Sequence, residues 1–255
     1  MSPSIVCLPQ PGKPKSRLLL EAFAAGAGGE VAGPTERLPD AQIAFFGIVQ
    51  LEKQFAAARA RGGYWYGDNS YWDVSRGRLF RFSLNALQAT GREAPDWPRY
   101  RALGLAVEPW RRDGRHIVVV EQSPHFMREV AGWSTWLDDV LAKLKAHTDR
   151  TVVVRRWSSN KAGLGKTLHQ DLDDCWALVT HASAASNEAL LFGVPVFVTG
   201  QCAALAMGLS QLEQIESPRR PDGRETWAAA LAGRQWTIEE LRSGEAWQRL
   251  TDTAG

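Results

Sequence analysis

The chain has 255 residues, 44% of them hydrophobic, and its 30 Lys and Arg against 28 Asp and Glu give a formal net charge of +2. This length suits one large α/β domain or two small ones, and the mild charge argues against a dedicated nucleic-acid binder while leaving a local basic face open. Three widely spaced cysteines exclude a disulfide framework and a structural zinc site and favour the cytoplasm, and no apolar run reaches the roughly 18–20 residues of a membrane span.

The first part of the chain alternates strand and helix patterns. The apolar run at 43–49 suits a parallel strand buried on both faces, and the helix pattern after it stops at a pair of glycines. The predicted elements are strand 4–8, helix 16–25, strand 43–49, helix 51–61, a strand starting at 64 and strand 79–87.

Residues 89–115 carry several prolines, glycines and arginines with little periodicity, so we expect a domain linker there, near position 110. The predicted domains are therefore 1–110 and 111–255. After the linker, strand and helix patterns alternate again, which implies a mostly parallel sheet with helices on both faces. These elements are strand 116–123, helix 134–148, strand 151–157, helix 168–174, strand 176–181, helix 186–193, strand 194–198 and terminal helices near 227–232 and 238–250.

The stretch VTHASAASNEALLFGVPVFV, residues 179–198, is the most specific signal in the sequence. In a parallel sheet, ligands bind outside the carboxyl ends of strands, so His181 and Ser183 fall at the rim of a crevice. Ser183 and Ser186 are suited to cap the next helix, whose N–H groups would face a pyrophosphate. Glu188 in the first turn suits the helix dipole and the ribose hydroxyls, although a capped helix without a ligand explains the pattern equally well.

The segment SNEALLFGVPVFV resembles the donor-site helix and strand of GT-B glycosyltransferases and the related sugar-nucleotide 2-epimerases. The resemblance covers mainly residues 116–200 and implies a GT-B-like α/β fold, with two Rossmann-like α/β/α halves facing a cleft. It places Glu188 on the nucleotide ribose and Ser183 and Ser186 near the diphosphate. Thr180 stands where the retaining pattern has a second glutamate, so retention and inversion both stay open.

The same resemblance implies a cation that balances the leaving diphosphate, and Arg155 at the end of a strand is the candidate. Gln122, Ser123 and His181 follow neighbouring strands and are further candidates for donor binding. Fixed cations and dipoles can stabilise the leaving group, so we expect no metal and no cofactor, with a UDP-sugar as co-substrate.

The acceptor is expected to bind the first half of the chain, where YWYGDNSYW places polar residues among aromatics. Asp68 is the candidate base that deprotonates the acceptor hydroxyl, against an Asx turn as the alternative. The other candidates for acceptor binding are Lys13, Trp65, Asn69, Tyr71 and Trp72.

A looser resemblance links the block 66–88 and the segment 235–247 to small glycosyltransferase-like proteins of phages and prophages. It implies a hydroxymethylated pyrimidine in phage DNA as acceptor and the host cytoplasm as location. The sequence thus predicts a glycosyltransferase; the alternatives are a saccharide-modifying transferase, a sugar-nucleotide epimerase, and a non-catalytic nucleic-acid-binding protein with this fold.

Overall fold

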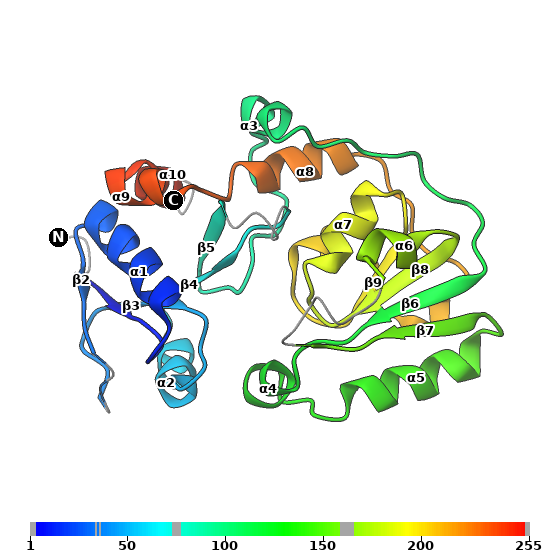
Figure 1. The fold of residues 1–255 in the computed structure, drawn as a ribbon, viewed down its shortest axis with the longest axis horizontal. Coiled ribbons are helices and arrows are strands. Elements are labelled where there is room, and N and C mark those ends of the chain that lie inside the picture. The colour runs from blue at the N-terminus through cyan, green and yellow to red at the C-terminus, as the bar shows by residue number, and fades with distance from the viewer. Residues whose placement is uncertain (1–3, 34, 36, 73–77, 159–165, 253–255) are drawn as a thin grey trace. The chain divides into compact units, whose positions relative to one another are not determined.

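The computed structural model describes residues 4–33, 35, 37–72, 78–158 and 166–252. The chain forms two compact units (Figure 1): unit 1 is Met1–Ala89 with Leu231–Gly255, and unit 2 is Thr90–Ala230. The expected boundary near 110 lies inside unit 2. Residues at the start of that unit are tied to α8 (Arg224–Ala232), since the N–H of Asp96 donates to the carbonyl of Ala229 at 3.0 Å.

Unit 1 is built on a five-stranded sheet in the order β2-β1-β3-β4-β5. The first four strands in that order run parallel, and β5 pairs antiparallel with β4. The strands are β1 (Ile5–Leu8), β2 (Glu30–Val31), β3 (Gln42–Phe46), β4 (Tyr64–Asn69) and β5 (Phe80–Leu84). Their apolar residues explain why the sheet is buried on both faces, as parallel sheets usually are.

Alternation along the strands divides the side chains of unit 1 between two layers. Ala44, Phe46 and Trp65 join the core beneath α1 (Pro14–Ala27), which also contains residues of α9 (Ile238–Ser243) and α10 (Glu245–Thr251). Phe45 and Tyr64 point to the other face, where both rings contact Phe55 of α2 (Glu52–Arg61) edge-on. The terminal helices therefore complete the core of the N-terminal sheet.

Unit 2 is built on a parallel four-stranded sheet in the order β7-β6-β8-β9. Its strands are β6 (His116–Val120), β7 (Thr151–Arg155), β8 (Cys175–Thr180) and β9 (Val196–Val198). Trp136, Val140 and Leu144 of α5 (Trp136–His147) pack on one face of this sheet. The shorter helices are α3 (Trp97–Ala102), α4 (Pro124–Phe126), α6 (Leu168–Leu172) and α7 (Ala185–Leu191).

The predicted α/β fold class is confirmed, and the strands and most of the helices lie within a few residues of their expected positions. One difference is the terminal helix expected over 238–250, which is two helices. Gly244 separates them because its φ of 87° is left-handed, a conformation that favours glycine. Within the part of the chain that the structure describes, no helix combines the length and apolar character that crossing a bilayer requires.

Gly26 of α1 should tolerate no side chain. A Cβ at this position would overlap the carbonyl oxygen of Leu241 and lie 2.9 Å from the backbone nitrogen of Gly244. We expect Gly26→Ala to lower the free energy of unfolding by about 1–3 kcal/mol, the usual cost of overpacking, in urea denaturation. Gly33→Ala is the control, because no atom of the described residues lies within 4 Å of the added Cβ. Equal stability of the two variants would contradict the close approach.

Candidate active site

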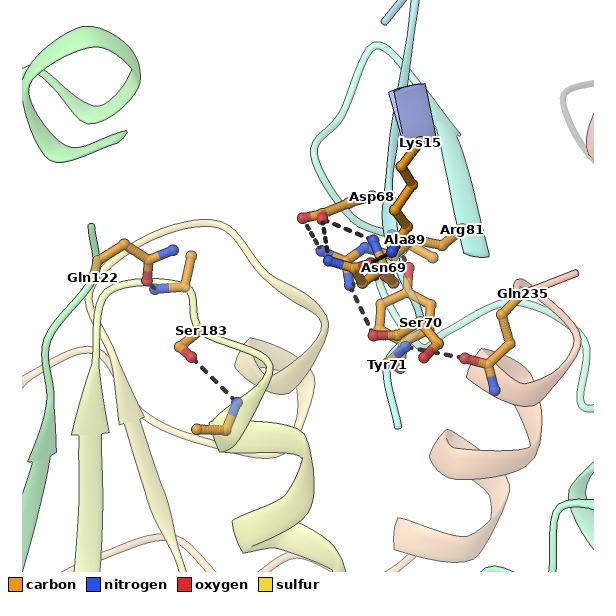
Figure 2. Close-up of polar contacts among 12 residues, drawn as sticks. Lys15, Asp68, Asn69, Ser70, Tyr71, Arg81, Ala89, Gln122, Ser183 and Gln235 are labelled. Atoms are coloured by element: carbon orange, nitrogen blue, oxygen red, sulfur yellow. Dashed lines mark hydrogen bonds and ion pairs between the residues drawn. The ribbon is translucent and has the colours of Figure 1, made fainter. Parts of the chain in front are cut away.

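The carboxyl ends of the strands in unit 2 gather the candidate donor residues at one edge of the sheet. Gln122 follows β6 and Ser183 follows β8, and these two strands are hydrogen-bonded neighbours. The side-chain oxygen of Gln122 accepts from the N–H of Ala182 at 3.3 Å (Figure 2). The hydroxyl of Thr180 donates to the carbonyl of Val120 at 2.9 Å, so both strand ends are fixed to each other.

The turn into α7 differs from the predicted cap. Ala184 is the N-cap residue and has no side-chain cap. Ser183 Oγ accepts from the N–H of Ala185 at 3.3 Å (Figure 2). The hydroxyl of Ser186 instead donates to the carbonyl of Ser183 at 2.6 Å, and this residue is only 1% exposed. Ser186 therefore braces the turn from inside, which corrects the expectation that it contacts the diphosphate.

Glu188 lies in the first turn of α7, as expected. Its Oε2 is 3.8 Å from Nε2 of His169, whose ring stacks on Phe192 at 4.4 Å between centroids. The carboxylate is partly exposed and so remains accessible to a ligand. The sequence-based prediction did not include His169, and helix-to-helix proximity of this kind leaves no local signal in the sequence.

Arg155 lies at the end of β7 and is already engaged. One of its guanidinium nitrogens forms an ion pair with Asp171 of α6 and donates to the carbonyl of Lys166. Both side chains of the pair are mostly buried. Asp171 therefore balances much of the charge that the sequence assigned to a leaving diphosphate. The neighbouring Arg156 pairs with Glu121 at 3.5 Å.

Ser123 and His181 bring aromatic side chains to the same edge of the unit 2 sheet. The Ser123 side chain accepts from the N–H of Phe126 and begins α4. This places the Phe126 ring 6.2 Å from the His181 ring, and Trp133 and Trp136 lie at 6.3 and 6.4 Å. Burial among these groups lowers the pKa of His181.

Unit 1 carries a second cluster, at the end of β4 (Figure 2). The antiparallel register sets Asp68 opposite Arg81, and Arg81 Nη2 lies 2.9 Å from Asp68 Oδ2. The other carboxylate oxygen accepts from the N–H of Asn69 at 2.7 Å. Asn69 Oδ1 in turn accepts from Lys15 Nζ at 2.7 Å. Both carboxylate oxygens of Asp68, the candidate base, are thus held, one by Arg81 and the other by Asn69.

Lys15 also belongs to this cluster, although the sequence-based prediction named Lys13. Its ammonium lies 5.0 Å from the Phe80 ring centroid and 5.9 Å from that of Phe46, close enough for cation–π attraction. Desolvation lowers its pKa, and the Asp68 charge opposes that shift. Lys13, the residue predicted instead, is the exposed N-cap residue of α1 and provides no side-chain cap.

The aromatic residues predicted to stack an acceptor are buried. Trp65, Tyr71 and Trp72 are 2%, 0% and 4% exposed. Trp65 packs against Phe23 in the core and donates from Nε1 to Gln42. The Tyr71 hydroxyl accepts from the N–H of Ala89 at 2.7 Å (Figure 2). These rings form the core of unit 1 and present no free face to a ligand, which corrects the sequence-based expectation.

The fold is shared with two solved glycosyltransferases. No protein-family model matches the sequence, and no curated protein matches it either. Among solved structures, the KpsC beta Kdo 2,7 transferase of Thermosulfurimonas dismutans matches with a TM-score of 0.56 at 12% identity, over 96% of this chain and 99% of that one. The beta Kdo 2,4 transferase of the same KpsC matches with a TM-score of 0.53 at 15% identity, over 90% and 91%.

This chain has the fold of these two transferases. The predicted GT-B-like fold is therefore confirmed, and the likeness extends over nearly the whole of both chains. At this identity it shows the fold alone. The relation to sugar-nucleotide epimerases and to phage proteins stays a prediction.

The lowered pKa of His181 should make folding stability depend on pH. The native state binds this proton less tightly than the unfolded chain, whose histidine titrates near the ordinary pKa of about 6.5. The contribution of neutral His181 to the unfolding free energy is therefore fully present above that pH and is lost as the pH falls below it. We expect His181→Gln to flatten the decline of the unfolding free energy between about pH 6.5 and pH 5, measured by urea denaturation. Parallel curves for the variant and the wild type would contradict it.

Proposed function

We propose that this chain is a glycosyltransferase that moves a sugar from a nucleotide-sugar donor to an acceptor hydroxyl. The observation that carries the proposal is the match to two Kdo transferases along 90% and 96% of the chain. It is supported by Glu188, which lies partly exposed in the first turn of α7, at the edge of the sheet where α/β proteins bind ligands.

The donor would bind unit 2. Glu188 would accept hydrogen bonds from the ribose hydroxyls, as a partly exposed carboxylate at a helix start can. Ser183, Gln122 and Ser123 would contribute polar contacts to the phosphate or the base. Arg155 would contribute less charge than the sequence suggested, because Asp171 shares it. We propose that Kdo belongs among the sugars to be tried, since both structural relatives transfer it.

Asp68 would accept the proton of the acceptor hydroxyl as the new glycosidic bond forms and the bond from sugar to phosphate breaks. Arg81 contacts Oδ2, and Asn69 contacts Oδ1 through its backbone N–H at 2.7 Å and its side-chain Nδ2 at 3.4 Å, whereas an ionised carboxylate offers about four acceptor sites. Arg81 therefore fixes the direction of the carboxylate and leaves it able to accept the hydroxyl proton. Asn69 and Lys15 would hold the acceptor beside it.

We propose a saccharide hydroxyl as the acceptor in preference to DNA. The modified pyrimidine was expected from the resemblance to phage proteins, and an enzyme that acts on a DNA base needs exposed rings to stack the flipped base. The candidate rings, Trp65, Tyr71 and Trp72, are buried in the core of unit 1. Polar groups such as Asp68 and Asn69 remain at the end of β4, and they suit a hydroxyl-rich ligand.

A thermal-shift screen tests the donor site. UDP, GDP, CMP, dTDP and ADP would be offered with their sugars, Kdo included. A ligand at about 100 times its dissociation constant stabilises the native state by about 2.7 kcal/mol, so a true donor should raise the melting temperature by several degrees. Glu188→Ala should abolish the shift. Glu239→Ala, in the first turn of α9, is the matched control and should retain it.

Product analysis then separates the alternatives. Wild-type protein with its donor should release nucleotide and glycosylate a saccharide acceptor, while Asp68→Asn should retain donor binding and lose transfer by about a hundredfold or more. Free epimerised nucleotide sugar would indicate an epimerase instead. Glycosylation of hydroxymethylated DNA would show that DNA, and not a saccharide, is the acceptor. Salt-sensitive DNA binding without any nucleotide binding would indicate a non-catalytic DNA-binding protein.

Metal removal tests the charge balance at the leaving group. We expect EDTA to leave the transfer rate unchanged, because fixed cations and helix N–H groups would stabilise the departing phosphate. Activity lost with EDTA and restored by Mg²⁺ or Mn²⁺ would show instead that a metal balances this charge.

A further inference from the structure

His181 has surroundings that a purely polar donor site does not need. Its ring is partly buried among Phe126 of α4, Trp133 of the short loop before α5, and Trp136 of α5. It follows β8 directly, one residue before the N–H of Ala182 that the Gln122 side chain fixes. The imidazole is therefore held at the edge of the sheet where the donor would bind.

A chain of hydrogen bonds leads from the core to this ring. The indole N–H of Trp136, a buried residue, donates to the hydroxyl oxygen of Thr199 at 2.7 Å. The same oxygen lies 3.0 Å from Nδ1 of His181. Thr199 follows β9, the strand next to β8, so three separate elements meet in this chain.

The donor and acceptor properties of the three groups restrict the protonation state of His181. An indole N–H can only donate, so it occupies one lone pair of the Thr199 oxygen. Among the described residues, Nδ1 of His181 is the one acceptor within reach of the Thr199 hydroxyl hydrogen. If the hydroxyl donates to Nδ1, the neutral ring must carry its proton on Nε2.

Nε2 is the free end of this chain. Within the described ranges it has no hydrogen-bond partner, and Gly200 lies beside it. A Cβ on Gly200 would come within 2.5 Å of Nε2 and 2.7 Å of Cε1, closer than any such contact can be. The backbone of Gly200 therefore lies close to the Nε2 edge of the ring, and a side chain at this position would displace the imidazole.

We propose that Trp136 and Thr199 hold His181 in the tautomer protonated on Nε2, and that this N–H donates to an anionic oxygen of the bound nucleotide-sugar donor. The inference rests on the proposed function and adds to it: His181 contacts the donor, and Thr199 and Trp136 are positioning residues that act through it. The neutral imidazole can donate a hydrogen bond through Nε2–H without placing an uncompensated charge among the aromatic rings when no ligand is bound.

Nitrogen NMR of histidine-labelled protein tests the tautomer without any activity. Near pH 7.5, the His181 signals should show an unprotonated Nδ1 and a protonated Nε2, with the assignment made from their loss in His181→Gln. Thr199→Val should move both signals toward the average of two exchanging tautomers, whereas Thr199→Ser should restore the wild-type pattern. A protonated Nδ1 in the wild type would overturn the proposed chain of bonds.

Binding measurements test the contact with the donor, using UDP, GDP, CMP, dTDP and ADP as probes. A glutamine amide can place its N–H near the position of Nε2, whereas an asparagine amide reaches only as far as Nδ1. We expect His181→Asn to weaken the best-bound probe by on the order of ten- to a hundredfold, the usual effect of losing a hydrogen bond to a charged group, and His181→Gln to retain most of the affinity. Gly200→Ala should weaken binding by displacing the ring.

The outcomes distinguish this inference from the proposed function. A nucleotide that binds the wild type, fails to bind Glu188→Ala and binds His181→Asn unchanged would overturn the role of His181 while leaving the donor site intact. No binding by any of the five nucleotides would overturn both. A loss of affinity in His181→Asn and Thr199→Val, with rescue in His181→Gln and Thr199→Ser, would support it.

Discussion

Parallel pairing of β6 with β8 is the constraint on which the candidate donor site depends. Parallel strands end at the same edge of a sheet, so residues that follow them along the chain become neighbours in space. The Thr180 hydroxyl fixes the two ends by donating to Val120, and the Gln122 side chain accepts from the next turn. The turn into α7 then stands at a fixed place, with Ser186 bracing it from within and Glu188 partly exposed. The bonds that stabilise these strand ends therefore also set the positions of Gln122 and Glu188.

In unit 1, the charged guanidinium of Arg81 is buried. The Arg81 side chain is only 5% exposed, while its partner Asp68 is 38% exposed. A buried guanidinium is costly unless each of its donors is matched. Arg81 meets part of this requirement through the carbonyls of Asn69 and Ser70 and by lying over the Tyr71 ring. The consequence for Asp68 is a carboxylate fixed in direction at the end of a strand.

The comparison with the Kdo transferases shows how little sequence a fold of this kind needs. Identities of 12% and 15% accompany a match along almost the whole chain. Many different hydrophobic residues of similar size can fill the same core, so a fold can be kept while most side chains change, provided that the pattern of apolar positions is kept. Chemistry depends on single side chains. Whether this chain acts as its structural relatives do must therefore be decided at Glu188, Asp68 and His181.

The sequence by itself determined the α/β class, most element positions and the placement of Glu188 in a helix start, because periodicity and glycine signals are local. Only the tertiary structure decided which residues meet. The sequence pattern predicted that Trp65 and Tyr71 form a stacking surface, but the hydrophobic effect buries their rings in the core. The sequence predicted that Arg155 is a cation available to a ligand, whereas in the fold it forms an ion pair with Asp171. The chain from Trp136 through Thr199 to His181 joins residues far apart in sequence, and no local pattern encodes such a contact.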